Sequence, residues 1–135
     1  MASRKIEDLD PRLQPLAQRH RDLCAKEGID LLITCTFRDD SEQDALWKIG
    51  RSGDKRPKVT WVRRGSHNIR DARGNPASTA YDVVPLRNGK CVWGTTGADL
   101  ALWNRIGALA KSLGLEWGGD WKVRDYPHCQ LPGGK

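Results

Sequence analysis

The chain has 135 residues, of which 38% are hydrophobic and 30% charged, and its net charge is +6. This composition is typical of one folded domain with a sizeable core and excludes a disordered chain. No apolar run approaches the roughly 20 residues that cross a bilayer, so we expect no stable membrane insertion. The positive charge favours an anionic partner without choosing among nucleic acid, lipid phosphate and carboxylate-bearing polymers.

The N-terminal stretch MASRKIEDLDPRL is polar and lacks the apolar segment of a signal peptide. We therefore expect a protein that is made in the cytoplasm without an export signal. Cys24, Cys35, Cys91 and Cys129 are scattered and form no C-x-x-C pair of the kind that binds metals. The cysteines are accordingly expected to be reduced and mostly buried.

The first helix is predicted over residues 11–27, where apolar side chains recur at helical spacing and Gly28 stops the helix. His20 lies on the apolar face, where we expect it to pack and not to bind a metal. The next stretch, 29–37, is rich in β-branched and apolar residues and predicts a buried strand.

A second helix follows this strand, with Asp40 or Ser41 as its N-cap and Gly50 or Gly53 as its stop. The basic stretch 51–65, RSGDKRPKVTWVRRG, is expected to be a surface loop.

The second half begins with β structure that reverses at 74–76 and again at 87–90, where turn residues occur. Residues 95–114 give the clearest helical pattern, ended by Gly114. The order of elements predicts an α+β fold, with helices packed on a small antiparallel sheet.

Two side chains on either side of the first reversal stand out. In a regular hairpin that turns at Gly74–Asn75, His67 lies directly opposite Asp82, with their Cβ atoms about 5 Å apart. If the charged stretch between them bulges as a loop instead, the two residues still flank the same excursion. Both side chains could then hold one ion.

The closing stretch RDYPHCQLPGG offers further groups for such an ion. Pro127 excludes a helix there, and a bend near it would turn Asp125 and His128 towards a common point. His128 would then be the third metal ligand, and Asp125 would stand beside the ion without binding it.

Two imidazoles and one carboxylate suit Zn²⁺ and leave a fourth position open for water. Zn²⁺ in such a site acidifies water and polarises a carbonyl group. An unligated acid beside it can take a proton from the water and pass it to a leaving amine. This arrangement predicts metal-assisted amide hydrolysis with one Zn²⁺ per chain.

Three segments carry a resemblance to a known family: GSHN with Ser66 and His67, STAYDVVP with Asp82, and EWGGDWKVRDYPHCQL at the end. They resemble, in this order, the M15 zinc peptidases, which include D,D-carboxypeptidases, vancomycin-resistance D,D-dipeptidases and phage L-alanyl-D-glutamate endolysins. Upstream, TCTFRDDSEQDALWKIGRS is similar to a further family segment. The resemblance covers residues 30–131 and is strongest to the phage endolysins.

The resemblance implies His67, Asp82 and His128 as zinc ligands and Asp125 as the catalytic acid and base. Arg38 matches the family's active-site arginine, which binds substrate and steadies the developing oxyanion. An ion pair of Arg38 with a neighbouring acid is the alternative.

Other residues have two interpretations each. Ser66 either orients its neighbours or the substrate, or caps a turn. Gln43 either contacts the site or caps a helix. Trp117 and Trp121 either line the cleft or pack in the core, and Cys129 is expected to point away from the metal.

One departure concerns the spacing of the first two ligands. The family usually has six residues between its first His and its Asp, whereas fourteen separate His67 from Asp82. An insertion at a turn accommodates the difference. Asp71 is the rival ligand if the insertion is placed elsewhere.

The resemblance implies a monomeric single-domain enzyme over residues 1–135, without a separate wall-binding module, that cuts the stem peptide of peptidoglycan after release from the host cytoplasm. L-Ala–D-Glu is the expected bond, with D-Ala–D-Ala as the alternative. The alternative from another functional class is a basic nucleic-acid-binding protein in which Trp61 stacks on bases. The peptidase is the main prediction, and with it we expect no nucleic-acid partner. A relative that only binds cell wall is disfavoured because all four site residues are present.

Overall fold

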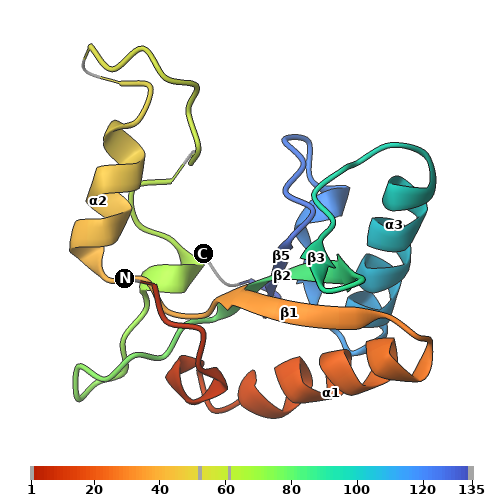
Figure 1. The fold of residues 1–135 in the computed structure, drawn as a ribbon. Helices are drawn as coiled ribbons and strands as arrows, with labels where there is room; N and C mark the ends of the chain where they lie inside the picture. The colour runs from red at the N-terminus through yellow and green to blue at the C-terminus, as the bar shows by residue number, and fades with distance from the viewer. Residues whose placement is uncertain (1, 52, 61, 134–135) are drawn as a thin grey trace.

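The computed structural model describes residues 2–51, 53–60 and 62–133 (Figure 1). Its helices and strands follow one another as α1 (Gln14–Lys26), β1 (Asp30–Cys35), α2 (Asp40–Lys48), β2 (Ala80–Arg87), β3 (Lys90–Cys91), α3 (Gly97–Ser112), β4 (Glu116–Trp117) and β5 (His128–Gln130). Three short 3-10 helices accompany them: η1 (Ile6–Asp8), η2 (Ser66–Asn68) and η3 (Gly118–Asp120). The predicted α+β class is confirmed.

The sheet has five antiparallel strands, in which β1, β2, β5 and β4 lie side by side and β3 pairs with β2. Strand β2 is central, because it pairs with β1 along one edge and with β5 along the other. The register sets Asp82 opposite Cys35 on β1 and opposite His128 on β5. Segments from both halves of the chain therefore meet at the start of β2.

The core lies between the sheet and two helices. Helix α1 packs against β1 and α3, and α3 packs against β4 (Figure 1). The buried side chains come from both helices, β1, β2 and the C-terminal strands, and include Leu13, Ile33, Val83, Trp103 and Ile106. Burying such side chains is worth roughly 1.5–3 kcal/mol each, so this core fixes where β2 and β5 stand.

His20 lies fully inside this core. Its Nδ1 atom is 2.7 Å from the hydroxyl of Tyr81, and its Nε2 atom is 2.9 Å from the carbonyl oxygen of Ile106. These bonds join α1, β2 and α3. The prediction of a packing histidine is confirmed.

Helix α2 and the stretch that follows stand apart from the sheet (Figure 1). We call the described residues of 49–65 the arm. The arm returns to the sheet at η2, which carries His67. Arm arginines are paired with acids, Arg56 with Asp54 and Arg64 with Asp44.

The helices predicted from periodicity are present, with bounds shifted by a few residues. Helix α1 begins at Gln14, three residues after the predicted start, and Gly28 ends it with φ +77°. The predicted N-cap of α2 was wrong by one position: Asp39 caps this helix, because its side chain accepts the amide of Glu42 at 2.8 Å.

The first reversal departs from a regular hairpin. Thr79 N donates to Ser66 O and Ala77 N donates to Ile69 O, a register in which His67 does not face Asp82. The predicted cross-strand pairing was therefore wrong. His67 lies on a 3-10 turn, and Asp71 Oδ1 instead accepts the amides of Arg73 and Asn75 to close a local loop. The alternative of a bulging excursion is the one observed.

The second reversal follows the prediction, since Arg87 pairs with Lys90 across a turn in which Asn88 and Gly89 both have positive φ.

All four cysteines are free, and all but Cys91 are buried. Among the described residues, no helix has the length and apolar character that a membrane crossing requires.

Candidate active site

Asp82 lies near the start of the central strand β2, with β1 on one side and β5 on the other. Cross-strand partners project on the same face of a sheet, so the register alone brings His128 beside Asp82. The Asp82 side chain is 20% exposed.

His67 reaches the same point from η2. The amide of Arg38 donates to the carbonyl of His67 at 2.9 Å, and the Asn68 side chain donates to the carbonyl of Arg38 at 2.8 Å. The Asn68 amide oxygen also accepts the backbone N–H of Gly65 at 2.9 Å. The two bonds to Arg38 fasten η2 to the segment that follows β1, and the bond to Gly65 closes the start of η2 itself.

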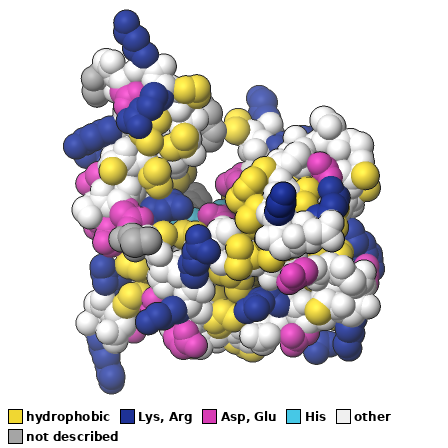
Figure 2. Space-filling view, in the orientation of Figure 1, with side chains coloured by type: hydrophobic (Ala, Val, Ile, Leu, Met, Phe, Trp, Pro, Cys, Tyr) yellow, Lys and Arg dark blue, Asp and Glu magenta, His cyan; other side chains and the backbone are white. Residues whose placement is uncertain are grey.

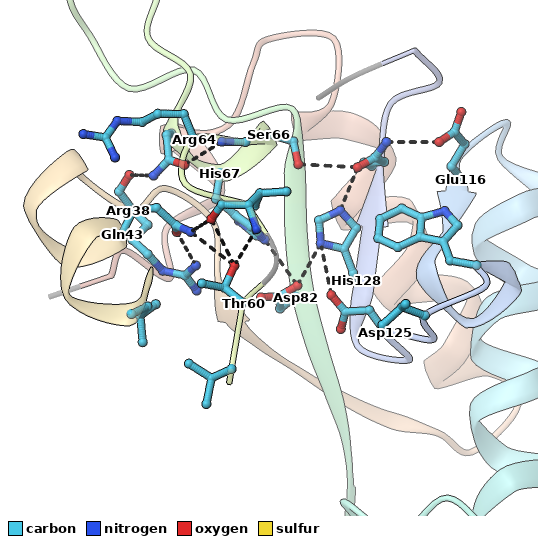
Figure 3. A pocket seen from close by; sticks show the side chains of 18 of the residues that line it. Arg38, Gln43, Thr60, Arg64, Ser66, His67, Asp82, Glu116, Asp125 and His128 are labelled. Carbon is cyan, nitrogen blue, oxygen red and sulfur yellow. Dashed lines mark hydrogen bonds and ion pairs between the residues drawn. The ribbon is translucent and has the colours of Figure 1, made fainter. Parts of the chain in front are cut away.

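The three side chains converge closely (Figure 3). Asp82 Oδ1 is 3.3 Å from His67 Nε2 and 3.4 Å from His128 Nδ1. The two imidazole rings are 5.2 Å apart between centroids and stand nearly perpendicular, at 85°. One nitrogen of each ring thus faces the same carboxylate oxygen.

The tautomer of His67 follows from its other nitrogen. Nδ1 lies 2.9 Å from the carbonyl oxygen of Thr36, which only accepts, so Nδ1 carries the proton. In the neutral ring, the Nε2 atom that faces Asp82 consequently presents a lone pair. Metal-binding histidines are commonly oriented by such a bond.

His128 is oriented in the same manner by a side chain. Its Nε2 atom is 2.8 Å from Gln130 Oε1, while the Gln130 amide nitrogen donates to Glu116 Oε2 at 3.0 Å. With the amide nitrogen committed to Glu116, the oxygen faces His128 and accepts its Nε2–H. The lone pair of His128 is therefore on Nδ1, directed at Asp82.

A cation fits between these atoms. His67 Nε2 and Asp82 Oδ1 are buried, and neither has a hydrogen-bond partner in the part of the chain that the structure describes. Three electron-rich atoms at such distances repel one another unless a proton or a metal ion lies among them. Two imidazole nitrogens and a carboxylate oxygen are ligands that Zn²⁺ prefers.

The electrostatics of the protein alone agree with this assignment. Burial lowers the pKa of His67, but attraction to Asp82 outweighs burial and raises it to about 10. Burial likewise raises the pKa of Asp82, and the two imidazoles outweigh it and hold that pKa far below its usual range. The site therefore favours positive charge at its centre.

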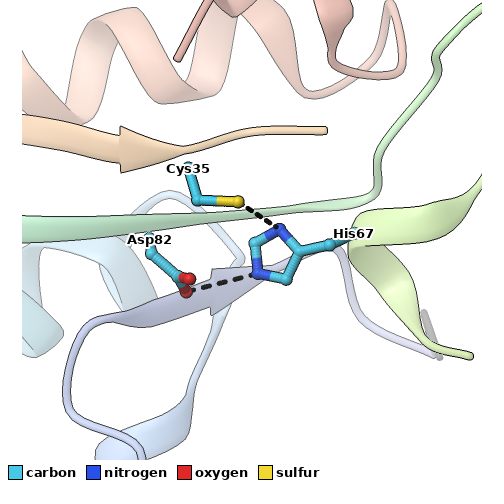
Figure 4. A group of neighbouring side chains, drawn as sticks. All are labelled: Cys35, His67 and Asp82. Atoms are coloured by element: carbon cyan, nitrogen blue, oxygen red, sulfur yellow. Dashed lines mark hydrogen bonds and ion pairs between the residues drawn. The ribbon is translucent and has the colours of Figure 1, made fainter. Parts of the chain in front are cut away.

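Cys35 offers a second ligand set with His67 and Asp82, whose donor atoms lie within 4.8 Å of one another (Figure 4). Its sulfur contacts Nδ1 of His67, 3.7 Å away, on the edge of the ring opposite the one that faces Asp82. A thiol placed there supports the ring from behind and does not share the open side of the site. The set with His128 suits the geometry better.

Asp125 lies beside the three proposed ligands, but its carboxylate is farther from His128 than the Asp82 carboxylate is. The Oδ2 atom of Asp125 is 3.9 Å from His128 Nδ1, and the Asp125 side chain is 51% exposed. Burial raises the pKa of Asp125, and so does the neighbouring Asp82. Both Asp125 N and His128 N take part in backbone bonds, to Gly118 O and Asp125 O respectively, which bend the chain as the prediction required.

Gly118 permits this bend. A Cβ atom at that position would collide with the backbone oxygen of Asp125. Gly119 and Gly107 have a similar function on the other side, because a Cβ at either would overlap the indole of Trp117. The glycines of the WGGDW segment thus bring the acid close to β5.

Comparisons with known proteins identify the family of this chain. The chain is 35% identical over 133 residues to the peptidoglycan L-alanyl-D-glutamate endopeptidase CwlK of Bacillus subtilis, covering 92% of this chain and 74% of that protein. The chain belongs to the M15 family of peptidases. The M15 family model described as D-alanyl-D-alanine carboxypeptidase matches residues 77–131 of this peptidase, a range that includes Asp82, Asp125 and His128.

Two further proteins resemble the peptidase. The L-alanyl-D-glutamate peptidase of Listeria phage A118 is 29% identical over 127 residues, covering 93% of this chain but only 39% of the phage protein. The crystal structure of the L-Ala D-Glu endopeptidase ChiX of Serratia marcescens superposes with a TM-score of 0.65 at 21% identity, over 97% of this chain and 88% of that one. The latter likeness concerns the fold.

The site lies at the base of a cleft of about 980 Å³ between the arm and the C-terminal segment. Figure 2 shows the molecule hollowed there, with acidic and histidine side chains visible at the bottom. Val59 and Val62 of the arm and Val123 opposite contribute exposed apolar side chains to the lining. The cleft is open enough to admit an extended peptide.

Arg38 of the peptidase lines this cleft. It donates to Gln43 Oε1 at 2.9 Å and contacts Cys35 Sγ at 3.5 Å, and within the described ranges it has no carboxylate partner. The alternative of an ion pair with a neighbouring acid is therefore not observed. Gln43 is 1% exposed and also donates to Val62 O at 2.7 Å, so it contacts the site and does not cap a helix.

The remaining candidates are divided between cleft and core. Trp121 lines the cleft, with its ring 4.9 Å from that of His128, whereas Trp117 is 4% exposed and belongs to the core. Ser66 is buried beside Gln130, to which it donates at 3.4 Å. Cys129 is fully buried, and burial raises its pKa, in line with a structural thiol. Trp61 lies outside the described residues.

Sequence reasoning missed three residues around the ligands: Asn68, Glu116 and Gln130. Gln130 had a detectable signal, since it lies two residues after His128 on a strand and so shares its face. Asn68 and Glu116 act through contacts between segments distant in the sequence, which no spacing reveals.

Proposed function

We propose that the chain is a zinc-dependent peptidase that hydrolyses the L-Ala–D-Glu bond in the stem peptide of peptidoglycan. One observation carries the proposal: two imidazole lone pairs and one carboxylate oxygen converge at the bottom of an open cleft, beside an acid that binds none of them. His67, Asp82 and His128 would hold one Zn²⁺.

Zn²⁺ bound by three protein ligands acts as a Lewis acid, which polarises a carbonyl group and acidifies water. Asp125 takes a proton from the water that attacks the scissile carbonyl carbon. It then delivers this proton to the amine nitrogen as the C–N bond breaks. Its raised pKa suits both the uptake and the return of a proton.

Arg38 binds the substrate and stabilises the negative charge that develops on the carbonyl oxygen. Its guanidinium is held by Gln43 at the cleft wall, and no described carboxylate pairs with it. Arg124 also lines the cleft and attracts the free carboxylates of a stem peptide. The net charge of +6 suits an anionic cell envelope.

The choice of bond rests on the relatives. Three of the proteins similar to this chain are named for cleavage between L-alanine and D-glutamate. The description of the matching family model favours the D-Ala–D-Ala bond as the second candidate. Selectivity between the two bonds depends on small differences in binding energy within the pocket, so a cleavage assay must decide between them.

The test combines metal content with a digest of purified muropeptides followed by mass spectrometry. We expect about one equivalent of zinc and release of L-alanine-terminated fragments, both lost in His67→Ala and in Asp82→Ala. Asp71→Ala is the matched control, because Asp71 closes a loop remote from the cleft. Loss of zinc in Asp71→Ala with retention in Asp82→Ala would contradict the proposed ligand set.

The alternative of nucleic-acid binding has less support from the arm than its basic sequence indicated. Arg56, Arg63 and Arg64 of this segment pair with acids, which reduces the charge available to phosphates. Strong DNA binding with a steep salt dependence, in protein that purifies without zinc, would favour that alternative.

A further inference from the structure

We infer that Glu116 and Gln130 act as a relay that sets the tautomer of His128 and so keeps its Nδ1 lone pair available to a metal. Both are positioning residues, since neither lies among the proposed ligands. The inference rests on the proposed zinc site, but its first step concerns the protein alone.

The relay is a chain of three side chains on two paired strands (Figure 3). Gln130 and His128 project from the same face of β5, and Gln130 lies opposite Glu116 on β4. The distances are 2.8 Å from His128 Nε2 to Gln130 Oε1 and 3.0 Å from Gln130 Nε2 to Glu116 Oε2. Gln130 is 6% exposed, so water does not substitute for these partners.

An amide group has nearly the same shape in its two orientations, and only its partners select one of them. A carboxylate accepts hydrogen bonds and donates none, so Glu116 requires the NH₂ group of Gln130 on its side. Ser66 Oγ lies 3.4 Å from Gln130 Oε1 and donates to it in this orientation. The oxygen is thereby directed at His128.

The opposite orientation of the Gln130 amide would change which nitrogen of His128 carries the proton. An NH₂ group facing Nε2 of His128 would require that atom to accept, and the ring proton would move to Nδ1. Nδ1–H would then point at Asp82 Oδ1 and form a hydrogen bond in the place of a metal ion. Glu116 thus acts on the proposed metal site through an intervening amide, from β4.

Glu116 is itself held in place. Its second oxygen, Oε1, accepts the backbone amide of Gly133 at 3.3 Å. The strand position and this bond hold the carboxylate at one end of the relay while leaving it partly exposed. Substitution of Glu116 therefore alters the relay with little disturbance of the core.

The first test reads the tautomer in metal-free protein. Long-range ¹⁵N–¹H NMR at pH 9 should find the ring proton of His128 on Nε2 in the wild type, and on Nδ1 for an appreciable fraction of Glu116→Leu. A wild-type proton on Nδ1 would overturn the inference, whether or not the protein binds zinc or cleaves muropeptides. Failure of the relay is therefore distinct from failure of the proposed function.

The second test measures zinc affinity by competition with a chelator. We expect Glu116→Leu and Gln130→Leu each to weaken zinc binding by about 10- to 100-fold, the range found when groups that orient metal ligands are removed. Glu116→Gln keeps a carbonyl acceptor for the Gln130 amide and should restore most of the affinity. Glu27→Leu removes a glutamate paired with Arg105, remote from the cleft, and serves as the matched control with unchanged affinity.

The double variant separates a relay from two independent effects. If Glu116 acts only through Gln130, Glu116→Leu adds no further loss to Gln130→Leu. Losses that multiply, or a Glu116→Gln protein as weak as Glu116→Leu, would overturn the inference. Thermal unfolding of the metal-free variants should show similar stabilities, as expected of residues that orient a ligand.

Discussion

At the scale of single residues, each proposed ligand is defined by what its other atoms contact. His67 and His128 use opposite nitrogens towards Asp82, because one ring donates to a backbone carbonyl and the other to a side-chain amide. Residue type alone names a histidine as a ligand but leaves open which nitrogen is available. The hydrogen bonds of the folded chain decide it.

Replacing Asp125 by Asn should separate catalysis from metal binding. The amide keeps the size of the side chain but takes up no proton, so we expect kcat to fall by about 10²- to 10⁴-fold with zinc content unchanged. Muropeptide turnover and metal analysis on one preparation measure both. His128→Ala is the comparison that loses both, and normal turnover by Asp125→Asn would remove Asp125 from its proposed role.

At the scale of elements, the sheet fixes one wall of the cleft and α2 with the arm forms the other. Gln43 connects the two, since its amide holds Arg38 on one side and the backbone of Val62 on the other. Cap and stop residues predicted that α2 exists, but the course of the arm depends on a contact that Gln43 makes 19 residues away. Local sequence does not encode such a contact.

Gln43→Leu should weaken substrate binding while leaving the metal site intact. Losing the bonds to Arg38 and Val62 frees both the guanidinium and the arm, and about 1 kcal/mol per hydrogen bond predicts a drop in kcat/KM of about tenfold or more. We expect KM to rise and kcat to fall, because Arg38 is proposed both to bind substrate and to stabilise the developing charge, with zinc affinity as in the wild type. Gln18→Leu, on the exposed side of α1, is the matched control, and zinc loss in Gln43→Leu would contradict this assignment.

The junction of α1, β2 and α3 gives a prediction on pH. Burial lowers the pKa of His20, so the folded state binds its proton less readily than the unfolded chain does. The stability that His20 contributes is present above its unfolded pKa of about 6.5 and is lost as the pH falls below that value, by up to about 1.4 kcal/mol per pH unit.

His20→Gln keeps a donor for Ile106 O and an acceptor for Tyr81 but does not titrate. Denaturant unfolding between pH 7.5 and 5 should therefore show a smaller loss of stability in this variant than in the wild type. Other titrating groups are common to both proteins and cancel in the difference. Parallel curves would show that His20 is not the group responsible.

At the scale of the whole molecule, the proposed ligands come from a 3-10 turn, a central strand and the last strand. A cation held among them links the two ends of the excursion 69–79 with the C-terminal segment. Binding to the folded chain alone then stabilises it by mass action.

Zinc at 100 times its dissociation constant should stabilise the protein by about 2.7 kcal/mol. For a chain of this size, that corresponds to a rise in Tm of about 10 °C over the chelated protein. Calorimetry with and without a chelator measures the shift. His67→Ala should show none, and an equal shift in that variant would place the zinc elsewhere.

The sequence by itself determined the class of fold, the helices with their glycine stops and the residue types of the site, because periodicity and turn chemistry are local properties. It also supplied the family, through segments in a fixed order. Tertiary structure alone decided the register around His67 and the partners of His67 and His128. Those features depend on strand pairing and on contacts between segments far apart in the chain, and a one-residue change in register redirects every side chain.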